Sequence, residues 1–281
     1  MVRVIKRQRY ERSTLNGGQV VLLELLYKYR FGNRALIGSC LGLKVGSSLH
    51  ERLEVLVKYG YLGKRLDIRS KALNKPAAYY VASKGIKALQ ALPDHEHIGE
   101  PAIRLSYQNK KTVHDEFVAH LLNIYECTQC LQRQYPSLKV FTERDTSRYS
   151  YFPKHSPETF LSLPTDDPEQ PHRFFFDIVR DRRPRRDLDN KLNNYVEFFD
   201  DGGWDETESE LPVILLVSEW GSSERSIQRS TRALLNRLDS TLRIYTTTAN
   251  AIRNATDSKA IWTDIQDTDE LVALDDIPIN P

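Results

Sequence analysis

Apolar residues at helical spacing, in three short and closely spaced segments, most constrain what the start of this chain can fold into. The first predicted helix carries residues 20–27, the second runs through residues 36–41, and the third carries residues 49–57. Gly42 and Gly60 are expected to end the second and the third of these helices. The expected N-cap of the first is Thr14 or Asn16, and that of the third is Ser47 or Ser48.

Two strand-like segments follow the three helices. They cover residues 61–68 and 77–83, they are joined by a basic loop, and a last helix is expected from about Ser83 to Leu92. Three helices and then two strands around a basic loop is the order of a winged helix-turn-helix domain, which we expect over residues 1–92.

Such a domain predicts where DNA contacts would lie. The third helix would enter the major groove, and the loop 69–75 would form the wing over the DNA backbone. Lys44, Ser47 and His50 lie near the N-terminal end of that helix, where base edges are reached, and Arg52 could reach a base or a phosphate. The phosphate-binding candidates in and beside the wing are Lys64, Arg65, Arg69, Lys71 and Lys75.

The distribution of charge favours the same interpretation. Residues 1–90 contain 18 Lys and Arg against 5 Asp and Glu, a balance of +13, whereas the rest of the chain has a balance of −11. A domain with so large an excess of positive charge attracts phosphate backbones, although a solvated basic face without a partner is the alternative.

Cysteine usage and apolar runs bear on the compartment. No apolar run approaches the roughly 18–20 residues that span a bilayer, so we expect no membrane partner and a cytoplasmic protein. The cysteines, Cys40, Cys127 and Cys130, are too few for a disulfide framework. Cys127 and Cys130 fall inside one predicted helix, and a zinc site would need two more ligands. We therefore expect buried thiols and no metal or cofactor.

The remainder of the chain is expected to form a second domain. Residues 93–112 are polar and without periodicity, which predicts a linker, and a long helix is expected from about 113 to 134. Strand patterns at 138–145, 150–152, 173–179, 212–218, 241–247 and 260–265 alternate with helices at 186–199 and 223–239. This alternation predicts an α/β domain with a mixed sheet over residues 113–267, followed by a tail, 268–281.

Several motifs together resemble the replication-relaxation family of plasmids, phages and other mobile elements. They are LLELLYKYRF in the first helix, VKYGYLGKR at 57–65, YYVASKGIKAL after the wing, His114 before the long helix, and FFFDIVRD followed by KLNNY. The resemblance covers nearly the whole chain. It implies a winged helix joined to a domain like that of restriction endonucleases, in a DNA-binding protein.

Endonucleases of that kind bind a divalent ion with acidic residues on neighbouring strands and use a nearby lysine to orient the attacking water. Here Asp177 occupies the second acidic position, at the end of RFFFD, and Lys191 on the next helix could supply the lysine. Val179 stands where a lysine or a further acid is expected. A structural ion pair between Asp177 and Lys191 is therefore the plainer interpretation.

The first acidic position of that pattern aligns with Phe152-Pro153-Lys154, where a cation replaces the carboxylate. Glu143 or Asp145 on the preceding strand could compensate, which makes Glu143 a third catalytic candidate. With one carboxylate missing we expect weak Mg²⁺ binding and no cleavage of DNA.

The sequence thus predicts a sequence-specific protein that binds double-stranded DNA, acts as a homodimer, and takes part in replication initiation, relaxation or their control. A metal-dependent DNA endonuclease (a nickase), which would need Mg²⁺, is one alternative. A transcriptional repressor is another.

Overall fold

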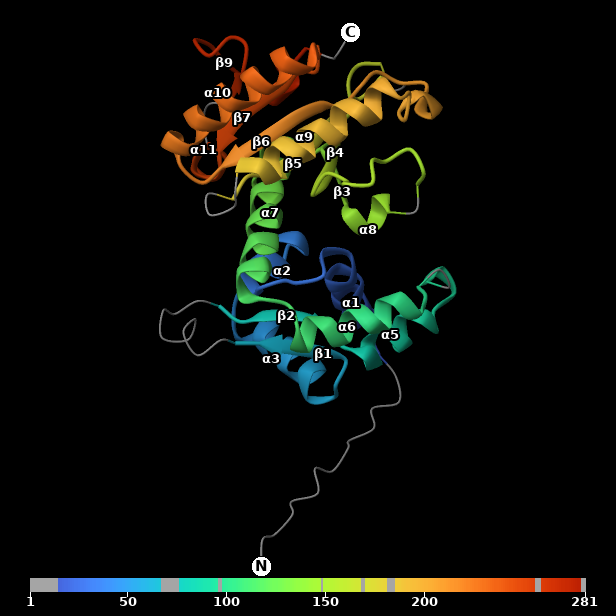
Figure 1. The fold of residues 1–281 in the computed structure, drawn as a ribbon. Helices are drawn as coiled ribbons and strands as arrows, with labels where there is room; N and C mark the ends of the chain where they lie inside the picture. Colours follow the sequence, from blue (N-terminus) through green and yellow to red (C-terminus); the bar gives the residue numbers. More distant parts are fainter. Residues whose placement is uncertain are drawn as a thin grey trace, which may run out of the picture. The chain divides into compact units, whose positions relative to one another are not determined.

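The computed structural model divides into two compact units, Met1–Tyr125 and Glu126–Pro281, with the boundary inside helix α7 (Asp115–Gln134) (Figure 1). Both units combine helices and strands, so the protein is mixed α and β. No helix within the described ranges combines the length and the apolarity that a membrane crossing requires. The residues that the structure describes are 15–66, 76–95, 98–147, 149–167, 170–180, 185–255 and 259–278.

The first unit packs helices around a two-stranded antiparallel sheet. β1 pairs with β2, with Leu62 opposite Val81, and Gly32 adds a single bridge to Tyr79. In chain order the elements are α1 (Gly17–Tyr29), α2 (Arg34–Cys40), α3 (Ser47–Lys58), β1 (Leu62–Arg65), β2 (Ala78–Val81), α5 (Ser83–Gln90), the 3₁₀ turn η1 (Pro93–His95) and α6 (Glu100–Lys111).

Local signals set the ends of these helices. Asn16 and Gln19 form a capping box at the start of α1, which confirms Asn16 as a cap. The expected caps of α3 are wrong, because Ser47 is already helical and Gly46 occupies the N-cap position without a side-chain hydrogen bond. Gly60, at φ +79°, follows α3 in a left-handed conformation that suits glycine.

The expected linker, 93–112, is wrong, because most of it is helix. α6 occupies Glu100–Lys111 and packs against α5, with Ala102 and Ile103 in the core of the first unit. Its buried face also contains Ser106 and Asn109. Because the buried face of α6 consists largely of small or polar residues, it gives no apolar periodicity in the sequence, and the helix is therefore not predicted.

The second unit is built on a seven-stranded mixed sheet with the order β3-β4-β5-β6-β7-β8-β9. β5, β6 and β7 run parallel, and the outer strands are antiparallel to their neighbours. The strands are β3 (Lys139–Thr142), β4 (Thr159–Leu163), β5 (His172–Ile178), β6 (Val213–Ser218), β7 (Ile244–Thr248), β8 (Trp262–Asp264) and β9 (Leu271–Val272).

Two long helices, α9 (Arg185–Asp200) and α10 (Gly221–Leu238), cover one face of this sheet (Figure 1). They bury Leu192 and Leu234, for example, against Phe175 and Ile214 of the central strands, where every residue of β6 is buried. Such continuous burial is expected of a parallel strand covered on both faces. The short elements of the unit are α8 (Glu143–Thr146), η2 (Asp205–Thr207), α11 (Ala249–Asn254) and η3 (Leu274–Asp276).

Three strand predictions in this unit are wrong in whole or in part. The expected strand 138–145 ends at Thr142, because Glu143–Thr146 form helix α8. Residues 150–152 form no strand, whereas Thr159–Leu163, expected to be a loop, forms β4 between β3 and β5. Thr159, Leu161 and Leu163 are buried and alternate with half-buried neighbours. The prolines that precede this short alternating run make it resemble a loop in sequence.

The expected tail, 268–281, is also wrong in part. β9 pairs with β8, so β8 is not the edge of the sheet, and Leu274 and Ile277 are buried. The backbone N–H of Leu274 donates to the Tyr135 hydroxyl at 3.0 Å. The described part of this segment therefore belongs to the second unit.

Candidate functional sites

The expected base-reading residues lie at the start of α3 or just before it: Ser47, His50 and Arg52 belong to the helix, and Lys44 precedes it. Leu49, Leu53 and Leu56 bury one face of the helix in the core of the first unit. Lys44, Ser47 and Arg52 are exposed, and His50 is half-buried. Neither Lys44 nor Arg52 forms an ion pair with another described residue, so both cations are available to a ligand.

Glu54, on the same helix, forms a network that joins α3 to both strands. It accepts a hydrogen bond from Lys64 Nζ at 2.6 Å and another from the Tyr79 hydroxyl at 2.9 Å, while His50 Nδ1 lies 3.9 Å away. Burial would raise the pKa of Glu54, but the hydrogen bonds from Lys64 and Tyr79 outweigh it and hold the pKa below its usual value. Lys64 thus fixes the strands to α3, and this ion pair competes with any phosphate contact.

Arg65 is held in the same way. Its guanidinium donates to the backbone carbonyl of Asn109 at 2.8 Å and to Asp115 Oδ1 at 2.6 Å. Asn109 Oδ1 in turn accepts from Arg30 Nε at 2.9 Å. Arg65 therefore anchors β1 to α6 and to the start of α7. The other three expected phosphate-binding residues, Arg69, Lys71 and Lys75, lie outside the described residues.

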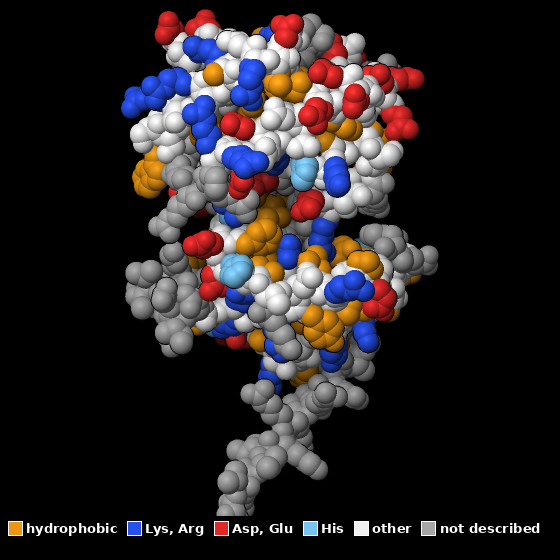
Figure 2. Space-filling model, in the orientation of Figure 1, with side chains coloured by type: hydrophobic (Ala, Val, Ile, Leu, Met, Phe, Trp, Pro, Cys, Tyr) orange, Lys and Arg blue, Asp and Glu red, His pale blue; other side chains and the backbone are white. Residues whose placement is uncertain are grey.

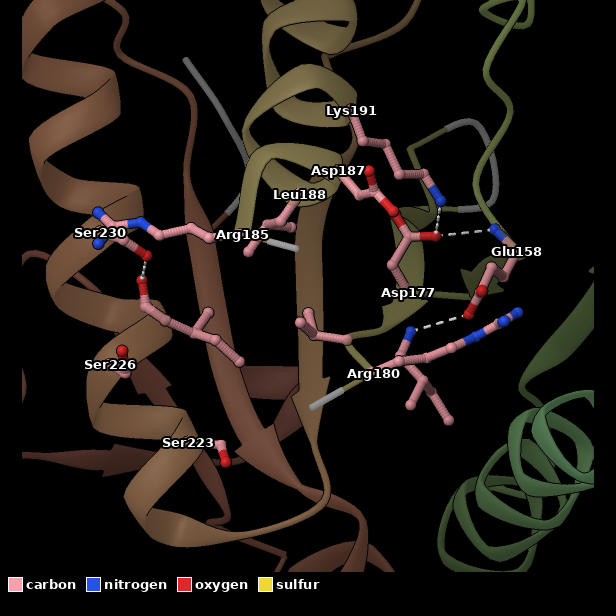
Figure 3. Close-up of a pocket in the computed structure, with 13 residues that line it drawn as sticks. Glu158, Asp177, Arg180, Arg185, Asp187, Leu188, Lys191, Ser223, Ser226 and Ser230 are labelled. Atoms are coloured by element: carbon pink, nitrogen blue, oxygen red, sulfur yellow. Dashed lines mark hydrogen bonds and ion pairs between the residues drawn. The ribbon is translucent and has the colours of Figure 1, made fainter. Parts of the chain in front are cut away.

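A pocket of about 320 Å³ lies in the second unit, beside the carboxyl end of β5 and the N-terminal halves of α9 and α10 (Figure 3). Asp177 and Lys191, two of the three catalytic candidates, are among its lining residues. The full lining is Glu158, Asp177, Ile178, Val179, Arg180, Arg185, Asp187, Leu188, Lys191, Ser223, Ser226, Ile227 and Ser230.

Asp177 is the buried acid among the residues that line this pocket. Its Oδ1 accepts hydrogen bonds from the Lys191 ammonium and from the backbone N–H of Glu158, the latter at 2.9 Å, and its Oδ2 accepts from the Tyr195 hydroxyl at 2.8 Å. Burial, reinforced by the charge of Asp177, raises the pKa of Tyr195 well above its usual value. The predicted ion pair between Asp177 and Lys191 is confirmed.

Glu158 is the residue that sequence reasoning missed. It lies one residue before β4, and because Thr159 pairs with Phe176 the hairpin brings Glu158 next to Asp177. Its Oε2 accepts from the backbone N–H of Ile178 at 2.9 Å (Figure 3). The available signal was Pro157-Glu158 in front of a short alternating run, and it depends on recognising β4 as a strand.

The alternative acids lie elsewhere. Glu143 is the exposed first residue of α8 and does not line the pocket. Asp145 caps that helix, accepting from the backbone N–H of Thr142 at 2.8 Å. Phe152-Pro153-Lys154, the segment aligned with the first acidic position, does not line the pocket: the Phe152 ring packs 5.6 Å from that of Trp204, and Lys154 is exposed.

The pocket therefore combines three cations, three carboxylates and three serine hydroxyls in one concave surface. The cations are Arg180, Arg185 and Lys191, and the carboxylates are Glu158, Asp177 and Asp187. Such a set can bind a phosphate oxygen through Lys191 and a divalent ion through Glu158 and Asp177, once the ion displaces the ammonium. The described residues contain no group of three or more His, Cys, Asp or Glu placed to hold a metal ion. Two protein carboxylates suffice for Mg²⁺ only when water and substrate phosphates complete its coordination.

The two helical cysteines are buried, as expected. Cys127 is fully buried and Cys130 nearly so, and burial raises the pKa of the Cys127 thiol to about 12. Arg133 Nη2 lies 2.9 Å from Cys130 Sγ. A thiol that stays protonated at neutral pH is a poor metal ligand and a poor nucleophile.

Comparison of the chain with protein-family models, with curated proteins and with solved structures finds no match.

Proposed function

We propose that this protein binds double-stranded DNA sequence-specifically, in the cytoplasm, with its first unit acting as a winged helix. The element order supports the proposal: α1, the Gly32 bridge to β2, α2, α3 and the β1–β2 hairpin follow one another as in that fold. The helix in the position of a recognition helix is α3.

The observation that carries the proposal is the contrast between the two faces of α3. One face is a buried leucine stripe, whereas Ser47 and Arg52 of the helix, and Lys44 just before it, are exposed to solvent near the helix start. Cations and hydroxyls in that position can reach base edges in a major groove. The balance of +13 over residues 1–90 supplies the long-range attraction to phosphates.

Selection of bound duplexes from a random pool by the full-length protein tests this proposal. We expect one enriched sequence, bound with a log–log salt slope near about −4 to −5, since five phosphate contacts contribute about 0.9 each. A flat salt response, or no enrichment over the starting pool, would refute it.

We also propose that the protein acts as a homodimer in replication initiation, relaxation or their control, as resemblance to the replication-relaxation family suggests. Two half-sites give the selectivity that one short helix lacks. The chain order α7, β3, β4, β5, α9, β6 is compatible with a restriction-endonuclease-like second unit. A palindromic selected site supports the dimer, and a monomeric mass by light scattering in the presence of that site contradicts it.

One observation favours a second candidate function, metal-dependent cleavage of a phosphodiester. Glu158 supplies, beside Asp177 and Lys191, the carboxylate that the sequence alignment lacked. In this candidate Glu158 and Asp177 would hold a divalent ion, which would supply polarisation of the phosphate, and the Lys191 ammonium would orient water.

Incubation of supercoiled plasmid with the protein and Mg²⁺ or Mn²⁺ separates the two functions. DNA binding alone leaves the plasmid intact. Nicking that is lost in both Glu158→Gln and Asp177→Asn, with duplex binding retained, establishes the second function. The matched control is Glu143→Gln, which changes an exposed acid outside the pocket.

A further inference from the structure

Helix α6, which no part of the proposed duplex interface uses, has one firmly attached face and one free face. The attached face contains Ala102, Ile103, Ser106 and Asn109, all buried. The Asn109 carbonyl and side chain accept hydrogen bonds from Arg65 and Arg30, at 2.8 and 2.9 Å. The buried face and these hydrogen bonds fix α6 to the first unit, so the residues on its exposed face are held in a defined position.

The free face presents an aromatic ring between two cations. Tyr107 is 58% exposed, among the most exposed large apolar side chains of the described residues. Arg104 and Lys110 are exposed as well, three residues before and three residues after it. Residues at this spacing are neighbours on a helix surface, and the three span about 9 Å along the helix axis.

Neither cation is compensated within the described part of the chain. The side chains of Arg104 and Lys110 form no hydrogen bond or ion pair with any other described residue, in contrast to those of Lys64 and Arg65. On the face of the first unit that carries α6, Figure 2 shows Lys and Arg side chains next to hydrophobic ones. An apolar partner would bury these two cations without an opposite charge, which costs free energy. The surface therefore suits an anionic partner.

We propose that the α6 face formed by Arg104, Tyr107 and Lys110 binds single-stranded nucleic acid. An unpaired base would stack on the Tyr107 ring, and the phosphates on either side would contact Arg104 and Lys110. Duplex DNA fits this face less well, because its bases are stacked on one another and offer no free ring to Tyr107. This surface is distinct from α3, so the inference goes beyond duplex binding.

Fluorescence anisotropy of the full-length protein with a labelled oligothymidylate of about 20 nucleotides tests this inference, since that length exceeds a usual single-strand site. We expect Tyr107→Ala to weaken binding about 5- to 150-fold, which corresponds to one lost base stack. Tyr107→Phe keeps the ring and should bind nearly as the wild type does. Arg104→Ala should reduce the log–log salt slope by about 0.7, the value of one single-strand phosphate contact.

Two controls make the result specific. Lys87 on α5 is also an exposed cation, but it has no aromatic neighbour at this spacing, so Lys87→Ala should leave oligothymidylate affinity unchanged. An abasic strand of the same length should bind equally weakly to the wild type and to Tyr107→Ala, because it has no base to stack.

Other outcomes overturn the inference. Absence of oligothymidylate binding, or equal affinity of the wild type and Tyr107→Ala, rules out a base stack on α6. If Tyr107→Phe is as weak as Tyr107→Ala and also loses duplex affinity, the hydroxyl contacts a duplex phosphate instead. If Tyr107→Ala binds both nucleic acids normally and loses affinity only for an acidic protein, the face is a protein interface. Duplex affinity measured in parallel tests the proposed function separately.

Discussion

Glu158 and Asp177 hold each other's strand ends in place through reciprocal bonds. The backbone N–H of Glu158 donates to Asp177 Oδ1, and the backbone N–H of Ile178, next to Asp177, donates to Glu158 Oε2, both at 2.9 Å. Two carboxylates of like charge are thereby kept at one end of the β4–β5 hairpin. Lys191 offsets their charge through its ion pair with Asp177.

We expect Lys191→Met to destabilise the protein by about 3 kcal/mol, because it leaves a buried carboxylate without its cation. The Asp177 side chain is only 5% exposed, so its carboxylate is poorly solvated once the partner is lost. Chemical denaturation measures the change. The double variant Asp177→Asn/Lys191→Met should recover part of the loss, and a double variant less stable than Lys191→Met would contradict a pairwise origin.

Alkaline pH should destabilise the fold through its buried tyrosines. Burial raises the pKa of Tyr79, Tyr135 and Tyr195 in the folded state, with Glu54 and Asp177 adding to the effect for the first and last. In the unfolded chain these phenols ionise near pH 10, whereas in the folded protein they stay neutral to higher pH. Their contribution to the free energy of unfolding is therefore complete below pH 10 and is lost as the pH rises further. Thermal unfolding from pH 8 to 11 measures this. Tyr195→Phe should flatten the decline, and an unchanged slope would exclude Tyr195 as a contributor.

Gly85→Ala should cost about 1–3 kcal/mol in the first unit, the usual range for overpacking. A Cβ at Gly85 would lie 2.3 Å from the backbone oxygen of Tyr61 and 2.7 Å from Val81 Cγ1, and the backbone cannot easily move away. Gly17→Ala is the matched control, since a Cβ there meets nothing within 4 Å and alanine favours the first turn of α1. Equal melting temperatures of the two variants would contradict the packing at Gly85.

Variants of the proposed duplex interface should separate base contacts from phosphate contacts. Lys44→Ala or His50→Ala should reduce the preference for the selected site over random duplex by about 1–3 kcal/mol, whereas Lys71→Ala or Arg69→Ala should weaken both alike. Competition binding against both duplexes measures the difference. Equal losses on the two duplexes for all four variants would mean that α3 is not the recognition helix.

Lys64→Ala provides an internal comparison. Because Lys64 is held by Glu54 at 2.6 Å, we expect its loss to alter the position of the hairpin relative to α3 rather than to remove one free phosphate contact. Its salt slope should therefore stay within a few tenths of the wild-type value, while Arg52→Ala, which removes a free cation, should reduce the slope by about 0.9. A reversed order of the two slopes would show that the ion pair opens on DNA.

Local pattern was enough to predict much of the fold. The Leu49, Leu53 and Leu56 stripe identifies α3, and the unbroken apolar run at 212–218 identifies the central strand β6. In both cases the side chains that define the element are also the ones it buries, so periodicity and burial coincide. The ion pair of Asp177 and Lys191 was predictable for a related reason, since β5 and α9 follow one another along the chain and pack together.

Only the tertiary structure determined which polar residues are buried, which form ion pairs, and which line the pocket, because these roles depend on partners far away in the sequence. Glu158 belongs to the pocket only because β4 pairs with β5, and α6 joins the core through the small residues Ala102 and Ser106, whose pattern does not predict burial. Lys64 and Arg65 have the sequence character of phosphate-binding residues, yet Glu54 and Asp115 hold them in ion pairs. A charged side chain can interact with solvent, with a ligand or with a distant residue of its own chain, and its sequence neighbourhood does not distinguish these partners. That choice depends on which opposite charge the fold brings within a few ångströms of it.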